Sequence, residues 1–224
     1  MPVVLDHLLT GPVAPLGPTS SGIDKHPVDG PVMLGPTGFA GDAQGDLKRH
    51  GGPDKAVHHY PFDHYAAWRA ELGDLPLLRA GGFGENLSTR GLTEADVAIG
   101  DRFRLGGAVI EVSQGRQPCW KLNLRFGVPD MARRVQDSGR TGWYYRVLQP
   151  GTVRAGDVLE PTERLCPEWT IARLWRVLYV DVMARDELTQ MAGLTLLPEG
   201  WRKYARNRLA SGRVEDWRSR LQGH

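Results

Sequence analysis

The sequence of 224 residues predicts a mainly β fold with a few covering helices, followed by a small C-terminal unit of three helices. Up to about residue 160, Gly and Pro punctuate short β-prone runs, a pattern typical of a barrel or sandwich of short strands. The dipeptide Gly-Asp recurs at residues 100–101 and 156–157, which suggests two similar turns in one closed sheet. Beyond Pro161 the apolar spacing changes to about 3.6 residues, the period of a helix.

The strands are clearest in the middle of the chain. Residues 102–105 and 108–113 flank Gly106-Gly107, a two-residue hairpin signal. Residues 109–112 are rich in β-branched side chains, which favour strands. Residues 143–148 predict a further strand of the same sheet.

Two helices are expected to interrupt the strands and to cover the ends of the barrel. Pro61 suits the first turn of a helix over residues 61–72, which Gly73 is placed to end. A second helix is predicted over residues 129–138, with Gly139 as its C-terminal cap.

The C-terminal part changes to helices over residues 170–180, 185–191 and 199–210, so we expect two domains, residues 1–163 and 164–224. The basic side chains of this unit could contact an acidic partner, but an ordinary solvated helix face explains them as well. Docking to a partner or formation of a homodimer is one expected role of the unit, and covering apolar barrel surface is the alternative.

Composition limits the classes of function. A net charge of +2 is too small to indicate binding to nucleic acid. Two cysteines, Cys119 and Cys166, make neither a disulfide framework nor a four-cysteine zinc site, which fits a reducing cytoplasm. No apolar run approaches the roughly 20 residues of a membrane-spanning helix, and no targeting segment is recognisable, so a cytoplasmic protein is expected.

Cys119 is the most informative candidate residue, because it follows a predicted strand and precedes helical periodicity. Arg116 and Lys121 would favour its thiolate, the form that acts as a nucleophile or a soft-metal ligand. The alternative is a small buried apolar residue, a common role of free cysteine.

A second candidate region is the polar stretch of residues 41–60. Gly51-Gly52 permits a close approach of the backbone to a ligand, and Asp54-Lys55 leads into a predicted strand over residues 56–60. A zinc or iron site would be the rival interpretation, built from His50, His58, His59 and His64 with Asp46 or Asp54. Neighbouring strand residues point to opposite faces, so only one of His58 and His59 can join a common site, and each histidine singly also suits a structural role.

The third candidate is the glycine-rich segment of residues 81–87. Its glycines could align backbone N–H groups toward an anion, and Asn86 adds an amide, although a plain turn between strands is an equal alternative. It is no P-loop, because the Gly-Lys-Ser/Thr ending is missing.

Ordered motifs over nearly the whole chain resemble the MOSC domain, the C-terminal domain family of molybdenum cofactor sulfurases. The motifs are His-Gly-Gly-Pro-Asp-Lys-Ala at residues 50–56, Phe-Gly-Glu-Asn-Leu-Ser-Thr at 83–89, Pro-Cys-Trp-Lys-Leu-Asn at 118–123, and Gly-Trp-Tyr at 142–144. Together with the helical tail, they resemble the bacterial YiiM type of that family.

The resemblance implies a β-barrel that carries molybdenum cofactor, with Cys119 as ligand to the metal. It also implies reduction of N-hydroxylated compounds such as hydroxylaminopurines and amidoximes, a detoxification of N-hydroxylated bases, with electrons from a separate flavin-containing reductase. We expect the pterin and its phosphate to be held by Lys55, Gly82, Phe83, Gly84, Asn86, Gln114, Arg116 and Arg146. Asp54, His59 and Lys121 are candidates for the acid that protonates the substrate nitrogen.

Three other functions are alternatives to this one. The leading alternative is a carrier or transfer protein for the cofactor or for sulfur, which uses Cys119 without reductase turnover. A pyridoxal-phosphate enzyme is disfavoured because no lysine stands in a context that singles it out. A nucleic-acid-binding protein would have to show salt-dependent binding.

Overall fold

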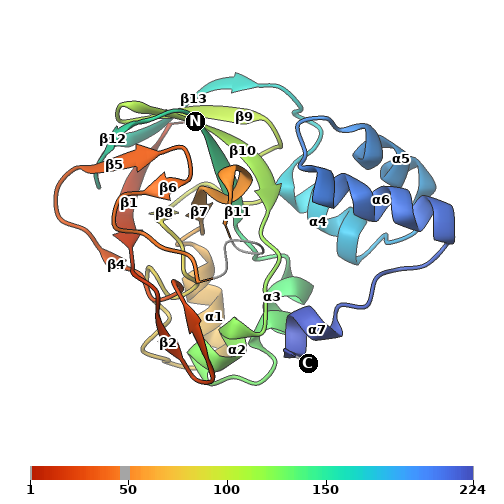
Figure 1. Cartoon of the computed structure of the whole chain (residues 1–224), viewed down its shortest axis with the longest axis horizontal. Coiled ribbons are helices and arrows are strands. Elements are labelled where there is room, and N and C mark those ends of the chain that lie inside the picture. Colours follow the sequence, from red (N-terminus) through yellow and green to blue (C-terminus); the bar gives the residue numbers. More distant parts are fainter. Residues whose placement is uncertain (1, 46–50, 224) are drawn as a thin grey trace.

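The computed structural model describes residues 2–45 and 51–223, and within this part seven strands close into a barrel (Figure 1). The order around the barrel is β13-β9-β10-β11-β7-β8-β1, and β1 pairs again with β13 to close it. All of these pairings are antiparallel except that of β7 with β8. The predicted mainly β barrel is confirmed.

The strands of the barrel are β1 (Val3–Thr10), β7 (Val57–His59), β8 (Leu87–Thr89), β9 (Asp101–Leu105), β10 (Ala108–Gly115), β11 (Trp143–Gln149) and β13 (Val158–Arg164). Short strands outside it are β2 (Ala14–Leu16), β3 (Thr19–Ser21), β4 (His26–Pro27), β5 (Val32–Gly35), β6 (Gly38–Phe39) and β12 (Gly151–Val153). The helices are η1 (Pro53–Lys55), α1 (His64–Leu72), α2 (Lys121–Phe126), α3 (Met131–Ser138), α4 (Ile171–Tyr179), α5 (Arg185–Gly193), α6 (Glu199–Ser211) and α7 (Arg218–Gln222).

The predicted hairpin is present, since β9 and β10 pair across Gly106-Gly107. Gly106 has a positive φ of 56°, a conformation that a residue with a Cβ adopts only at a cost. Strand β10 continues to Gly115, where it pairs with Trp143 of β11, so this long strand carries the chain to the loop of Cys119.

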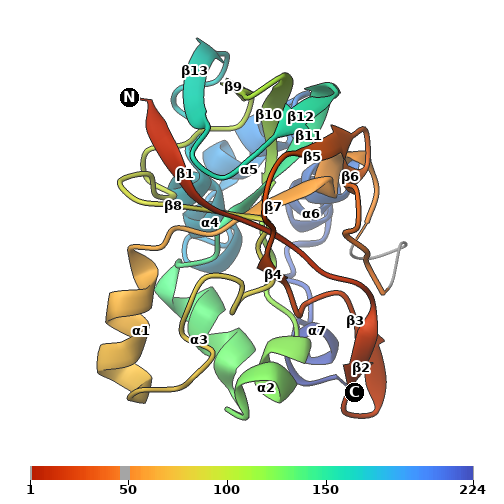
Figure 2. The ribbon, with the colours of Figure 1, turned by 90° about the vertical axis from the view of Figure 1, so that its left-hand side faces the viewer.

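Helices α1, α2 and α3 gather at one end of the barrel (Figure 2). They enclose a second apolar cluster that contains Tyr65, Trp68, Phe83, Leu122 and Met131. The expected covering helices are therefore present. The first starts at His64 rather than residue 61, because residues 61–63 form a turn, and the short α2 was not predicted as a separate helix.

Helices α4, α5 and α6 form the predicted C-terminal helical unit beside β10 (Figure 1). Their buried side chains belong to the same hydrophobic cluster as the barrel interior. Trp175 of α4 also donates its indole N–H to the carbonyl oxygen of Gln136 at 2.6 Å. The unit thus covers barrel surface, while its expected role in docking or dimerisation stays a prediction.

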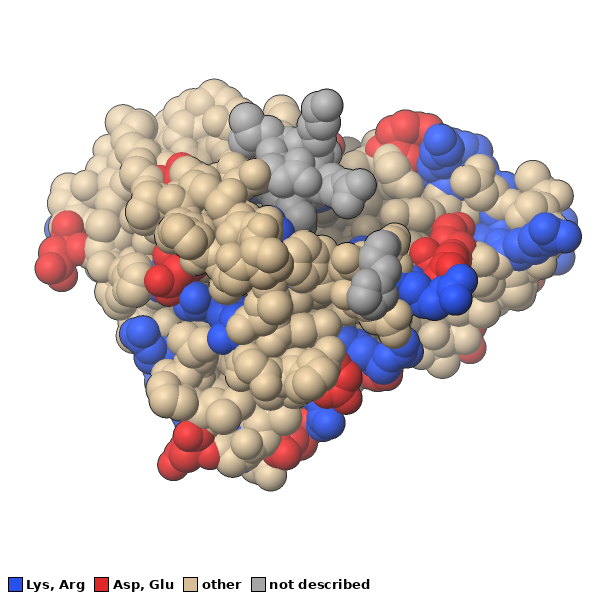
Figure 3. All heavy atoms as spheres, turned by 60° about the horizontal axis from the view of Figure 1, so that its bottom comes forward, with Lys and Arg blue, Asp and Glu red and all other residues tan. Residues whose placement is uncertain are grey.

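The surface of this unit mixes both signs of charge, as Figure 3 shows for one face. Arg202 pairs with Glu199 at 3.0 Å, and Arg176 pairs with Asp181 at 3.0 Å. Such pairing is typical of a solvated helix surface. None of the helices in the described part of the chain is long and apolar enough to cross a membrane.

Candidate active site around Cys119

Cys119 lies in the loop between β10 and α2, with a free, half-buried thiol. The loop leaves the barrel after Gly115 and passes Arg116, whose backbone N–H donates to the carbonyl oxygen of Gly142 at 3.0 Å. Cys119 lines two adjoining cavities, and so do Lys55, Gln117 and Tyr144. The thiol therefore stands at the junction between two compartments.

The first compartment, here called the cationic chamber, has an empty volume of about 660 Å³ including its open mouth. Its described lining residues include Lys25, Lys55, Arg116 and Lys121 and no Asp or Glu. A cavity with this lining favours an anionic ligand. The lining among the described residues is Ser21, Gly22, Ile23, Lys25, Ala43, Gln44, Gly45, Lys55, His58, Phe83, Gly84, Asn86, Arg116, Gln117, Cys119, Lys121 and Tyr144.

Two buried nitrogen atoms of this lining lack a hydrogen-bond partner among the described residues: Nη1 of Arg116 and Nε2 of His58. Arg116 is only 6% exposed, and its other terminal nitrogen donates to the carbonyl oxygen of Phe83 at 3.2 Å. A buried guanidinium without a carboxylate partner is costly in the free protein. Such donors are what a phosphate-bearing ligand would satisfy.

The second compartment, here called the aromatic chamber, is lined by Trp120, Tyr144, Tyr204 and Trp217. Unlike the described lining of the cationic chamber, it also contains two carboxylates, those of Glu215 and Asp216. The remaining lining residues are Lys55, Gln114, Gln117, Cys119, Glu215, Asp216, Ser219 and Arg220. The two chambers therefore differ in chemistry on either side of one thiol.

The neighbouring histidines of β7 point to opposite sides, as strand geometry predicts. His58 lines the cationic chamber, whereas His59 lies inside the barrel with no exposed surface. The ring nitrogens of His59 contact the hydroxyl groups of Tyr145 and Thr89 at 2.9 Å each. Burial lowers the pKa of His59 to about 3, so its ring is neutral. His59 therefore lies outside the described lining of both chambers, so the structure gives no support to its expected role as the acid.

His58 is likewise neutral, since burial and then the nearby Arg116 hold its pKa well below the usual range. Its backbone N–H donates to Oδ1 of Asn86 at 3.0 Å, which fixes the end of β7 against the glycine-rich segment. Asn86 lines the cationic chamber as predicted. Its side-chain N–H group donates to the carbonyl oxygen of Leu9 and to Oδ2 of Asp42 at 3.1 and 2.9 Å.

The glycine-rich segment is built differently from the expected anion cradle. The backbone N–H groups of Gly81 and Phe83 donate to the carboxylate of Glu85 at 2.8 and 3.1 Å, and the hydroxyl of Tyr65 donates to it at 2.6 Å. The N–H groups of Gly82 and Gly84 donate to carbonyl oxygens within the same loop. These N–H groups therefore already donate hydrogen bonds within the protein, which corrects the prediction that they bind the phosphate. Phe83 and Gly84 still line the chamber, whereas Gly82 does not.

Asp54 and Arg146 lie outside the described lining of both chambers. They pair with each other at 2.8 Å, and Arg146 also pairs with Glu111 at 2.8 Å on the outside of the barrel. Asp54 is 44% exposed. Neither the acid role of Asp54 nor the phosphate role of Arg146 fits this placement, because each charge already has a partner away from Cys119.

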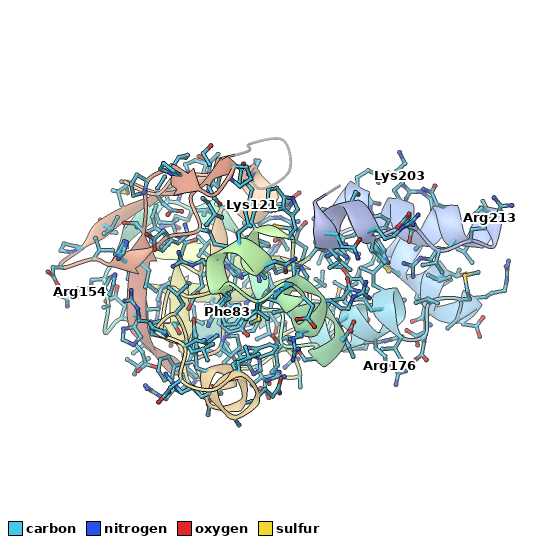
Figure 4. The ribbon with its side chains drawn as sticks, turned by 90° about the horizontal axis from the view of Figure 1, so that it is seen from below. Phe83, Lys121, Arg154, Arg176, Lys203 and Arg213 are labelled. Carbon is cyan, nitrogen blue, oxygen red and sulfur yellow. The ribbon has the colours of Figure 1, made fainter. Side chains whose placement is uncertain are left out.

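The other predicted site residues line the two chambers. Lys121, Lys55 and Arg116 line the cationic chamber, and Gln114 lines the aromatic one. Lys121, at the start of α2, donates its ammonium group to the carbonyl oxygen of Ser20 at 2.9 Å. Figure 4 shows Lys121 and Phe83 on the barrel side of the molecule, away from Lys203 and Arg213 of the helical unit.

The histidine metal site finds no support in the described residues. Across residues 2–45 and 51–223, no group of three His, Cys, Asp or Glu side chains is arranged to hold a metal ion. His50 and Asp46, which that hypothesis also needed, lie outside the described residues.

The C-terminal segment, residues 213–223, returns to the barrel and ends in α7 beside α2 and α3, which the sequence did not predict (Figure 1). Five of its residues line the aromatic chamber: Glu215, Asp216, Trp217, Ser219 and Arg220. A tryptophan between charged residues after the last predicted helix was the signal that could have marked this segment as functional. Nothing in the sequence indicates which distant loop that tryptophan contacts.

Comparison with known proteins agrees with this architecture. Residues 46–160 match the model of the MOSC domain, and residues 169–212 match that of the YiiM-like 3-alpha helix domain. The chain belongs to the MOSC domain family. Its resemblance to the YiiM type is confirmed as well, since both of that type's domains match.

Three relatives of this MOSC protein illustrate the similarity. Protein YiiM of Escherichia coli (strain K12) is 42% identical over 207 residues, which cover 91% of each chain. The crystal structure of YiiM from Escherichia coli matches with a TM-score of 0.85 and 36% identity, over 100% of both chains. A protein of Gibberella moniliformis (strain M3125 / FGSC 7600) named "Reductase" is 42% identical over 185 residues, 81% of this chain and 32% of that protein.

Proposed function

We propose that this MOSC protein is a molybdenum-cofactor-dependent reductase of N-hydroxylated compounds, in which the Cys119 thiolate binds the metal. The observation that carries the proposal is the position of Cys119 between a cationic and an aromatic chamber. One chamber suits a phosphate-bearing pterin and the other suits an organic substrate. Both would then reach the same sulfur atom.

The residues of the cationic chamber fit the cofactor. The unpartnered nitrogen of Arg116, with Lys55 and Lys121, would hold the phosphate, and Asn86 would face the pterin. Lys25 also lines the chamber, but its charge is already paired with Asp42. Molybdenum bound by two dithiolene sulfurs accepts one more soft ligand, which a thiolate supplies. Cys166 lines neither chamber, and burial, followed by the nearby Glu168, raises the pKa of its thiol.

The cofactor would supply a two-electron reductant that takes up the oxygen atom of the N–OH group. The protein would orient the substrate and provide protons, so that water and an amine or amidine are released. With Asp54 and His59 placed elsewhere, Lys121 and Lys55 are the chamber cations that we propose as proton donors. Lys55 lines both chambers beside Cys119, so it can face substrate as well as cofactor.

The electrons would come from a separate flavin-containing reductase. The fungal relative named "Reductase" favours an oxidoreductase over a carrier. The aromatic chamber does so too, because a protein that only carried the cofactor would need no organic binding site beyond its thiol.

The proposal is tested with protein made in a molybdate-fed host, analysed for metal and pterin and assayed with chemically reduced methyl viologen. We expect about one molybdenum per chain and reduction of benzamidoxime to benzamidine. Bound cofactor without reduction of benzamidoxime or 6-hydroxylaminopurine would favour a cofactor carrier. Protein that takes up neither metal nor pterin would contradict both the reductase and the cofactor carrier, and would leave the sulfur carrier as the alternative.

A further inference from the structure

The aromatic chamber is closed by the C-terminal segment, which neither matched family domain includes, since the helical domain match ends at residue 212. Trp217 lies where this segment crosses the chamber. Its ring is held edge-on by Tyr204 at 5.2 Å and by Tyr179 at 5.8 Å, and the Arg220 guanidinium lies 4.9 Å from its centre. The guanidinium carbon of Arg208 also lies 6.0 Å from the ring centre, so four neighbours hold the indole. The part of it that lines the chamber can contact a ligand with little loss of side-chain freedom.

Polar groups of the same segment lack partners. Nε of Arg220 and Oε1 of Glu215 are shielded from solvent and have no hydrogen bond among the described residues. Glu215 is held in place through its other oxygen, which accepts from Nε and Nη2 of the fully buried Arg208 at 2.9 and 2.7 Å. The chamber therefore offers a ligand one hydrogen-bond acceptor, Oε1 of Glu215, and one donor, Nε of Arg220, near the fixed ring of Trp217.

We propose that the C-terminal segment is the substrate side of the active site, with Trp217 as the stacking surface for a planar aromatic ring and Glu215 as acceptor from its amidine-type N–H group. This inference rests on the proposed reductase function for the identity of the reacting group. It adds the residues that would select the substrate, since Trp217 would favour N-hydroxylated compounds that carry an aromatic or heteroaromatic ring. Trp217 would determine specificity, with no part in the chemical step.

The test compares two amidoximes that share the reacting group and differ in the ring, benzamidoxime and acetamidoxime. In Trp217→Ala we expect KM for benzamidoxime to rise about tenfold, the effect of losing one stacked ring. The kcat for benzamidoxime and the KM for acetamidoxime should stay within about twofold of the wild type. Trp217→Phe should recover most of the lost affinity because it keeps a stacking surface.

Arg213→Ala is the matched control, because Arg213 belongs to the same segment, is exposed and lines neither chamber. It should leave both KM values unchanged. A Trp217→Ala protein with wild-type KM for benzamidoxime would overturn the inference, and so would an equal rise for both amidoximes.

A binding measurement separates this inference from the proposed function. Benzamidine should bind the wild type and quench its tryptophan fluorescence, with at least tenfold weaker binding in Trp217→Ala and in Glu215→Gln. Circular dichroism and thermal unfolding of each variant identify any that fails to fold. If Trp217→Ala does not fold, Trp217→Leu takes its place, because it fills more of the space without providing an aromatic ring. If benzamidine binding depends on Trp217 but the protein has no reductase activity, the reductase function is refuted and the substrate site is supported. If the protein reduces amidoximes but benzamidine binding does not depend on Trp217, the reductase function is supported and the substrate site is refuted.

Discussion

The backbone N–H of Trp120 donates to the carbonyl oxygen of Arg220 at 2.8 Å, which ties the C-terminal segment to the loop of Cys119. The Arg220 side chain adds contacts to the carbonyl oxygen of Pro118 and to Oε1 of Gln136. Both neighbours of Cys119 in the sequence are thus held by one residue about a hundred positions further on, so the segment fixes the position of the thiol.

Arg220→Ala should loosen this loop. We expect alkylation of Cys119 by iodoacetamide, followed by mass spectrometry, to become several-fold faster than in the wild type. The free energy of unfolding should fall by about 1–3 kcal/mol, because hydrogen bonds from a charged group are lost. Arg213→Ala is the control, in which both values should stay unchanged. An unaltered alkylation rate in Arg220→Ala would show that the loop is held in place without that side chain.

The buried histidines predict a dependence of stability on pH. His59 has a pKa of about 3 in the folded protein against 6.5 in a free side chain, so between these values only the unfolded chain binds its proton. Its contribution to stability is therefore complete above pH 6.5 and is lost as the pH falls toward 3. One such proton corresponds to a slope of about 1.4 kcal/mol per pH unit.

His59→Gln removes this titrating group while keeping hydrogen-bonding capacity toward Tyr145 and Thr89. Denaturant titrations between pH 4 and pH 6 should show a slope of unfolding free energy against pH that is smaller by up to about 1.4 kcal/mol per unit. A variant with the slope of the wild type would mean that His59 titrates normally in the folded protein.

Arg116 should matter for the cofactor more than for the fold. In Arg116→Met, an unpaired buried charge is removed, so the cofactor-free protein should be as stable as the wild type or more stable. Pterin content after expression should fall about tenfold or more, since a buried donor to the phosphate is lost.

Arg125→Met is the matched comparison, because Arg125 is also buried but donates to the carbonyl oxygen of Gly82 and to Asp24, each at 2.9 Å. It should lose about 1–3 kcal/mol of stability. If Arg116→Met retained its pterin while losing stability like Arg125→Met, a purely structural role of Arg116 would be indicated.

Gly84 tests how tightly the glycine-rich segment is packed. Its φ is 77°, and a Cβ there would lie 2.7 Å from Cγ1 of Ile23. Gly84→Ala should cost about 2–5 kcal/mol, the sum of left-handed strain and overpacking. Gly91 has a similar φ of 75° with open space around it, so Gly91→Ala should cost only about 1–2 kcal/mol. Equal losses in chemical denaturation would contradict the packing against Ile23.

Local signals in the sequence predicted the barrel and the site loop well, because they act over short distances. The Gly106-Gly107 turn and the β-branched run of β10 determine a hairpin whatever surrounds them. Strand alternation also predicted that only one of His58 and His59 faces the site. The alternation does not indicate which of the two histidines faces the site, because that depends on which side of β7 faces the barrel interior.

The wrong site residues share a physical cause. The N–H groups of Gly81 and Phe83 were free in the sequence interpretation, but the Glu85 carboxylate accepts from both. Asp54 lies in a promising motif, yet its partner Arg146 is 92 positions away. Such pairings across the chain arise only when the barrel closes, and so does the return of Trp217 to the loop of Cys119.

The central claim is that the Cys119 sulfur binds molybdenum, and X-ray absorption at the molybdenum edge tests it most directly. In Cys119→Ser, the metal should lose one sulfur neighbour relative to the wild type, and reduction of benzamidoxime should stop, because a hydroxyl is a poor ligand for this soft site. Cys166→Ser should keep both the sulfur count and the activity. An unchanged sulfur count with wild-type activity in Cys119→Ser would contradict the account.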